Sequence, residues 1–124
     1  MAHEPAPRRV KTYTSTQGYV YQYYFVGKRA ALPDDPESPA TEFIFDVTAD
    51  RKSMFAVSIF LSEGVPRGWA SRHGRGLTEA EQYGAVKMRL FQAFDEIEHM
   101  MAEGRRLHVT GDELENFLSA LGVQ

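Results

Sequence analysis

The amino-acid sequence predicts an α+β fold. We expect an antiparallel sheet of three to four strands, a long helix packed across one face of the sheet, and a short C-terminal helix. Residues 10–26, 41–48 and 53–61 have the composition or the alternation of strands, and ten of the fifteen aromatic residues lie between residues 13 and 60. Residues 78–122 instead repeat apolar residues every three or four positions, after two T-x-x-E helix starts.

The N-terminal part predicts an arm and then one or two strands. Residues 1–9 hold two prolines and two arginines and little to bury, so we expect a flexible arm. Residues 10–26 are rich in Thr, Tyr and Val, which fit a pleated, half-buried surface. Gln17 and Gly18 in the middle of this run permit either a hairpin turn or a bulge in one long strand, and we favour the hairpin.

Two further strands are predicted after a loop. Residues 27–41 contain three prolines and no periodicity, which indicates a loop with a flexible tip. Residues 41–48 alternate, with Phe at positions 43 and 45 on one face. After a polar turn, residues 53–61 are apolar on both faces, which favours a central position in the sheet or a second surface covered by another chain.

The long helix is predicted over residues 79–103, after a connecting loop at residues 62–77. Thr78 and Glu81 form a capping box at its start, and Gly104 is expected to end it as a left-handed cap. One apolar stripe runs along this helix. Its members are Tyr83, Val86, Leu90, Phe94, Ile97 and Met101.

The short final helix begins at a second capping box. Thr110 and Glu113 have the spacing of this motif, Leu114, Phe117, Leu118 and Leu121 share one side, and Gly122 is expected to end the helix. Residues 106–109, between the two helices, are apolar enough at alternate positions to form a short extended piece.

Composition sets limits on the class of protein. The 124 residues fit one domain, which we place at residues 10–124, and the net charge of −3 gives no global attraction to nucleic acid or to an anionic membrane. Residues 1–75 carry ten Lys and Arg against eight acidic residues, whereas residues 76–124 carry four against nine. Without cysteine, an apolar membrane-spanning run or a signal peptide, we expect a cytoplasmic protein.

The candidate ligand or anion site is the stretch RGWASRHGRG, residues 67–76. Arginine binds carboxylate or phosphate in a forked geometry, and the stretch leads into a helix start, where backbone amides favour an anion. The candidate residues are Arg67, Trp69, Arg72, His73 and Arg75. In the alternative that we favour, Trp69 anchors a loop in the core and the arginines are solvated or pair with acidic residues elsewhere.

Motifs for catalysis or cofactors are lacking. The four histidines are scattered without metal-ligand spacing, and the sequence has no nucleophile elbow, P-loop or dinucleotide glycine pattern. We therefore expect no metal, no cofactor and no nucleic-acid partner. The leading hypothesis is a non-enzymatic protein-interaction module that forms a homodimer. The alternatives are a nucleic-acid or anion binder that uses the loop from Arg67 to Arg75, and a small enzyme centred on His73.

Overall fold

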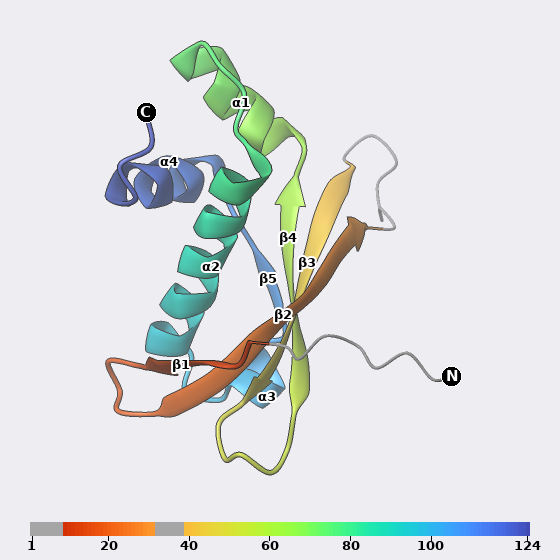
Figure 1. Ribbon diagram of the computed structural model, residues 1–124, viewed down its shortest axis with the longest axis vertical. Coiled ribbons are helices and arrows are strands. Elements are labelled where there is room, and N and C mark those ends of the chain that lie inside the picture. Colours follow the sequence, from red (N-terminus) through yellow and green to blue (C-terminus); the bar gives the residue numbers. More distant parts are fainter. Residues whose placement is uncertain (1–8, 32–38) are drawn as a thin grey trace.

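The computed structural model describes residues 9–31 and 39–124. Within these residues five strands form one sheet, in the order β1-β2-β3-β4-β5. They are β1 (Lys11–Thr14), β2 (Val20–Ala30), β3 (Ala40–Thr48), β4 (Phe55–Ser62) and β5 (Arg106–His108). The first four strands are antiparallel to their neighbours, and β5 lies parallel to β4 (Figure 1). The predicted α+β class is confirmed, with five strands in place of three to four.

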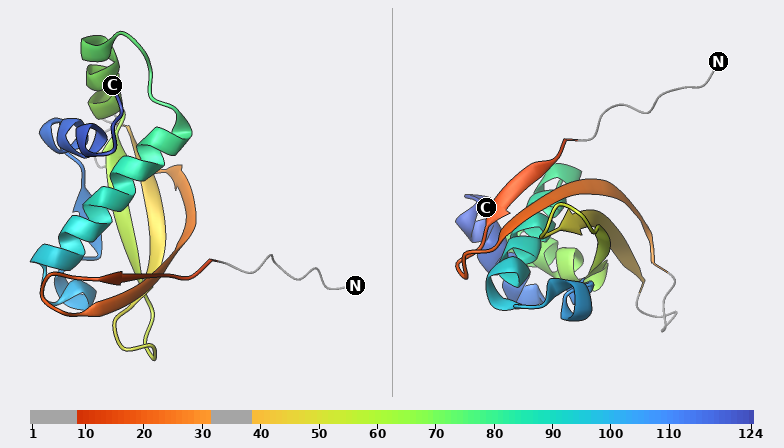
Figure 2. Two further views of the ribbon diagram at one scale, coloured as in Figure 1. Left: turned by 60° about the vertical axis from the view of Figure 1, so that its left-hand side comes forward. Right: turned by 90° about the horizontal axis from the view of Figure 1, so that it is seen from below.

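The helices gather on one side of the sheet. They are α1 (Gly64–His73), α2 (Glu79–Glu96), α3 (Met100–Glu103) and α4 (Gly111–Ala120). α2 crosses one face of the sheet diagonally, α1 and α4 lie at one end of it, and α3 lies at the opposite end (Figure 2). No helix of the described residues covers the other face of the sheet, and this second face is called the open face below.

β1 and β2 form a hairpin, as predicted. The amide of Ser15 donates to the carbonyl of Tyr19 at 2.8 Å, and the amide of Gly18 donates to the carbonyl of Ser15 at 2.9 Å. Gly18 has a φ of 91°, a conformation that side chains with a Cβ rarely adopt. The turn therefore depends on this glycine, and the alternative of one long bulged strand does not hold.

The loop predicted at residues 27–41 is shorter than expected at both ends. β2 continues to Ala30 and β3 begins at Ala40, because the β2–β3 ladder continues beyond the bulge after Phe25 as far as the pair Ala30 and Thr41. Arg29 pairs with Glu42 on β3, and Lys28 pairs with Glu79 on α2. The expected flexible tip at residues 32–38 and almost all of the expected arm, residues 1–8, lie outside the described residues.

The prediction of a loop at residues 62–77 is wrong, because most of this segment forms helix α1. Pro66 lies in the first turn, where the missing amide hydrogen is tolerated. Gly74, with a φ of 76°, ends the helix by donating its amide to the carbonyl of Ala70 at 2.8 Å. Two glycines and a proline inside α1 interrupt the apolar pattern that would have predicted a helix, and Trp69 is its one buried residue.

The continuous helix predicted over residues 79–103 is also wrong. α2 ends at Glu96, Ile97 is extended with φ −102° and ψ 116°, and α3 follows as a separate turn. The chain leaves the helical conformation at Ile97 and places α3 at the end of the sheet (Figure 1). It buries Met100 to 2% exposure and leaves the stripe residue Met101 49% exposed.

The glycine expected as a left-handed cap has a different role. Gly104 has φ −110° and ψ 20°, so it is not left-handed. It is buried, and a Cβ at this position would overlap the sulfur of Met100. Close packing, and not backbone conformation, is the reason for glycine here. Gly122, which follows α4, does have the positive φ (77°) expected of a helix end.

The core lies between the sheet and α2, and it is rich in aromatic rings. Tyr21 stacks on Phe94 with ring centroids 4.2 Å apart, and Tyr13 stacks on Phe91 at 4.4 Å. The hydroxyl of Tyr13 also donates to Asp95 at 2.8 Å, which ties the edge strand β1 to α2. The long helix predicted to lie across the aromatic sheet therefore does so, although it is shorter than predicted.

Candidate functional site

Trp69, His73 and Arg75 form a stack at the end of the molecule where α1 meets α4. Trp69 is fully buried, and the His73 ring lies on it with centroids 4.1 Å apart and an interplanar angle of 15°. The Arg75 guanidinium carbon lies 5.1 Å from the indole centroid. The indole Nε1 is buried and has no hydrogen-bond partner among the described residues. Trp69 therefore anchors this segment in the core, as in the alternative that we favoured, although the segment is helix α1 and not a loop.

Glu115 on α4 binds two of the predicted site residues at once. Arg72 donates through Nε to its Oε1 at 2.8 Å, and Nε2 of His73 lies 2.9 Å and 3.0 Å from its two oxygens. The Arg72 hydrogen bond, followed by that of His73, lowers the pKa of the Glu115 carboxyl. This carboxylate orients the imidazole, so the hypothesis of an enzyme centred on His73 has a partner that the sequence did not reveal.

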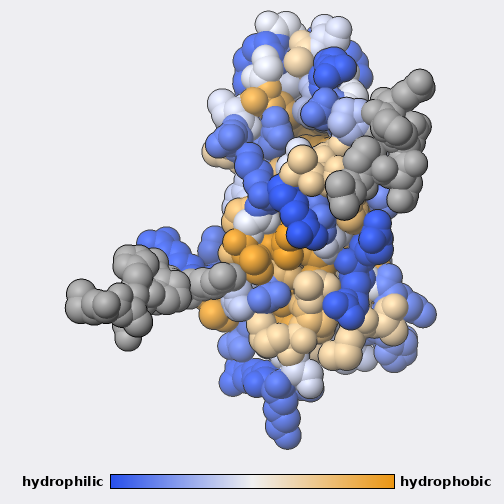
Figure 3. Space-filling view, turned by 90° about the vertical axis from the view of Figure 1, so that its right-hand side faces the viewer, coloured by the Kyte–Doolittle hydropathy of each residue, from blue (hydrophilic) through white to orange (hydrophobic). Residues whose placement is uncertain are grey.

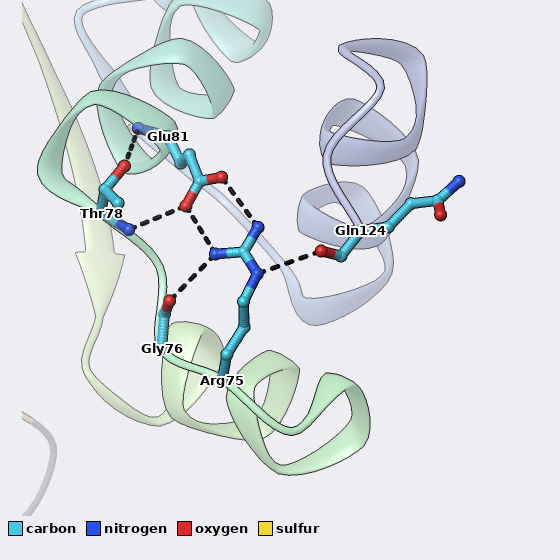
Figure 4. Close-up of polar contacts among 5 residues, drawn as sticks. All are labelled: Arg75, Gly76, Thr78, Glu81 and Gln124. Atoms are coloured by element: carbon cyan, nitrogen blue, oxygen red, sulfur yellow. Dashed lines mark hydrogen bonds and ion pairs between the residues drawn. The ribbon is translucent and has the colours of Figure 1, made fainter.

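Arg75 joins three segments of the chain (Figure 4). It donates to both oxygens of Glu81 at 3.0 Å and 2.9 Å, to the carbonyl of Gly76 at 3.1 Å, and through Nε to the backbone oxygen of Gln124 at 3.0 Å. The Arg75 hydrogen bond is the largest of the contacts that lower the pKa of Glu81 to about 2. Glu81 also closes the predicted capping box with Thr78.

Arg67 lies apart from the other four residues. It pairs with Glu63 at 3.5 Å across one turn of α1, and both side chains are largely exposed. Each arginine of the predicted site therefore already faces a glutamate, and an incoming anion would have to displace a carboxylate. The partners Glu81 and Glu115 lie 6 and 42 or more residues away along the chain, so no local sequence signal identified them.

The open face of the sheet is a second candidate surface. The strand register places Ile44 on β3 between Gly27 on β2 and Ser58 on β4, and places Arg106 on β5 next to Ser58. Its apolar members follow the outward positions of these strands. They are Val20, Ile44, Ala56 and Phe60, with Val26 in the β2 bulge and Met54 just before β4.

Polar contacts link neighbouring strands on the open face, between these apolar residues. Glu42 is only 8% exposed although it points away from the core, because Arg29 covers it. Its carboxylate accepts from Arg29 Nε at 2.9 Å and from the Ser58 hydroxyl at 2.6 Å. Arg29, and then Ser58, lowers the pKa of this carboxyl. Tyr24 donates to Asp46 at 2.6 Å in the neighbouring row.

Stacked side chains of β4 and β5 form one side of the open face. The Phe60 ring lies on the His108 ring with centroids 5.3 Å apart, and the Arg106 guanidinium lies 4.8 Å from the Phe60 centroid. Figure 3 shows the side of the molecule to which the open face turns, with apolar side chains at its centre and charged ones around them. Large exposed residues such as Val20, at 44%, and Met54, at 50%, belong to this surface.

The chain matches no protein-family model, no curated protein and no solved structure. Over residues 9–31 and 39–124, every helix is too short or too polar to cross a membrane. In the same residues, no three His, Asp or Glu side chains come together in a way that could hold a metal ion. The function therefore has to be argued from the surfaces described above.

Proposed function

We propose that this protein is a non-enzymatic interaction module, and that a second copy of the chain binds its open face to form a homodimer. The observation that carries the proposal is that Ile44, Ala56 and Phe60 point away from the core and remain partly exposed, with no helix of the described residues over them. Contiguous apolar surface with a polar rim is typical of protein-binding sites.

The outward side chains of β4 are the main support. β4 lies between β3 and β5, and its inward residues Phe55, Val57, Ile59 and Leu61 are buried in the core. Burial in the core does not explain the apolar residues on the outward face of β4, which no helix of the described residues covers. α2 has two further apolar residues beside its stripe, Met88 and Phe91. Both pack against the core, so they lend no support to a second interface on α2.

Charges on the open face favour a second copy as the partner. Arg106 lies on β5 at one side of the apolar centre, and Asp46 lies on β3 near the other. In a twofold dimer the same patch meets itself, so a patch that carries both signs of charge offers each charge an opposite partner. A patch of one sign would repel its copy.

The test is the molar mass in solution, measured by size exclusion with light scattering at tens of micromolar. We expect twice the chain mass of 14.0 kDa for the wild-type protein, and the chain mass for Ile44→Lys, because a lysine would be buried without a partner in the dimer. The control is Met101→Lys, which places the same charge at a methionine in α3 that is 49% exposed and lies outside the open face.

Three results would overturn the proposal. They are a wild-type monomer over the whole concentration range, a dimer that survives Ile44→Lys, and a dimer that Met101→Lys disrupts as strongly. Far-UV circular dichroism of both variants shows whether the fold is intact, so that dissociation is not confused with unfolding.

A further inference from the structure

A groove runs between β2 and the N-terminal half of α2, on the helix side of the sheet. It consists of two adjoining hollows of about 210 and 310 Å³, and both are lined by Phe25 and Tyr83. The first hollow is completed by Arg9, Lys11, Tyr23 and Tyr24, and the second by Lys28, Phe43, Glu79 and Ala80. The groove is therefore aromatic along its floor and basic at one end.

Two lysines lie near the basic end: Lys11 lines the first hollow, whereas Lys87 lines neither hollow and lies beside the ring of Tyr83. Lys87 follows Tyr83 by one turn of α2, and its Nζ lies 5.8 Å from the Tyr83 centroid and 5.7 Å from the Phe91 centroid. Lys11 pairs with Tyr23 in the β1–β2 ladder and lines the hollow beside Tyr83. Burial, together with contact and repulsion from Lys11, lowers the pKa of Lys87.

Neither lysine is neutralised by the described residues. Six other basic residues form ion pairs with glutamates; they are Lys28, Arg29, Arg67, Arg72, Arg75 and Arg89. Within residues 9–31 and 39–124, Arg9, Lys11 and Lys87 take part in none. Two like charges held close together beside apolar rings are unfavourable, and an anion between them would relieve their repulsion.

We propose that this groove binds a small anion with an aromatic body, a carboxylate or phosphate held by Lys11 and Lys87 with its ring against Phe25 and Tyr83. The combined hollows have the size of small-molecule sites, which are mostly apolar with a few placed charges. A peptide strand is less suited, because the bulge between Phe25 and Gly27 and the charges of Lys28 and Arg29 protect the adjacent edge of β2.

The experiment is an amide NMR titration of the full chain with four probes: phenyl phosphate, phenylacetate, inorganic phosphate and phenol. We expect the amides of Phe25 and Tyr83 to shift with at least one aromatic anion, which should bind about tenfold more tightly than phenol and than inorganic phosphate. The tighter of the two aromatic anions identifies the anionic group. Lys87→Met should weaken this binding about tenfold or more. Lys52→Met, a lysine in the β3–β4 turn, should leave it within about twofold.

A second readout is the pKa of the Lys87 side chain, measured before and after the aromatic anion is added. The side-chain pKa of Lys87, followed by NMR, should lie below the ordinary lysine value of 10.5 and should rise when the aromatic anion is added. Absence of shifts with both aromatic anions, equal binding by inorganic phosphate, or unchanged binding in a folded Lys87→Met variant would each overturn the proposal. Phe25, Tyr83 and Lys87, whose signals are followed, lie outside the open face, so these results do not depend on whether the open face forms a dimer.

Discussion

Trp69 should control the stability of the α1 end, and two substitutions of it should differ sharply. Trp69→Ala removes the whole buried indole, and the loss expected for such a truncation is about 3–5 kcal/mol. Trp69→Phe removes about two carbon groups, at about 0.8 kcal/mol each. It also removes an unpaired buried N–H, whose burial costs about 1–3 kcal/mol. The two effects oppose each other, so Trp69→Phe should change stability by no more than about 1 kcal/mol.

The assay is urea unfolding at 25 °C followed by far-UV circular dichroism, because the substitution removes the chain's only tryptophan and with it the fluorescence signal. Arg67→Ala serves as the control on the same helix, since its ion pair is exposed and should contribute less than about 0.5 kcal/mol. If Trp69→Phe lost as much stability as Trp69→Ala, the unpaired indole N–H would carry no cost. If Trp69→Ala lost less than about 1 kcal/mol, the tryptophan would not anchor α1.

Three further predictions concern single contacts. The fold raises the pKa of Tyr13 from 10.0 to about 12, chiefly by burial, so the stability that it contributes is complete below pH 10 and is lost as the pH rises toward 12; unfolding of Tyr13→Phe should depend less on pH in that window, and an unchanged slope would contradict this. The pKa of Glu42 is lowered below 4.5, first by Arg29, so its contribution is present above pH 4.5 and is lost as the pH falls through the lowered value; Glu42→Gln should flatten the acid limb of a stability-against-pH curve, and a curve as steep as that of the wild type would count against the network. Arg75→Lys loses the forked contact with Glu81 and the bond to Gln124, so hydrogen exchange should speed up at the amide of Val123; Arg67→Lys should leave this amide unchanged, and equal rates in both variants would refute the role of Arg75 as a clamp.

Local chemistry explains which elements could be predicted from the sequence. Both capping boxes, Thr78 with Glu81 and Thr110 with Glu113, are present where the T-x-x-E spacing placed them, because the motif involves only the residues of one turn. The β1–β2 hairpin was predicted for a similar reason, since one glycine in a run of strand-forming residues sets the turn. These features need no information from distant parts of the chain.

Contacts between residues far apart in the chain explain which elements and ion pairs could not be predicted from the sequence. α1 has two glycines and a proline, and it is held by the burial of Trp69 and by the contacts of Arg72 and His73 with Glu115 on α4, none of which a local window reveals. α2 ends at Glu96 although the apolar stripe continues to Met101, and the break at Ile97 lets Met100 be buried in the core. The pairing of the site arginines with glutamates follows from the same long-range packing, as does the grouping of Lys11 with Lys87.

The late position of β5 in the chain has a consequence for synthesis. β4 is complete at Ser62, but its outer edge receives a partner only when Arg106–His108 arrive, after three helices have been made. During that interval a strand with apolar side chains on both faces carries free backbone amides and carbonyls, which can pair with another nascent chain. Fragments that stop before residue 106 should therefore aggregate, whereas chains extended through β5 should not.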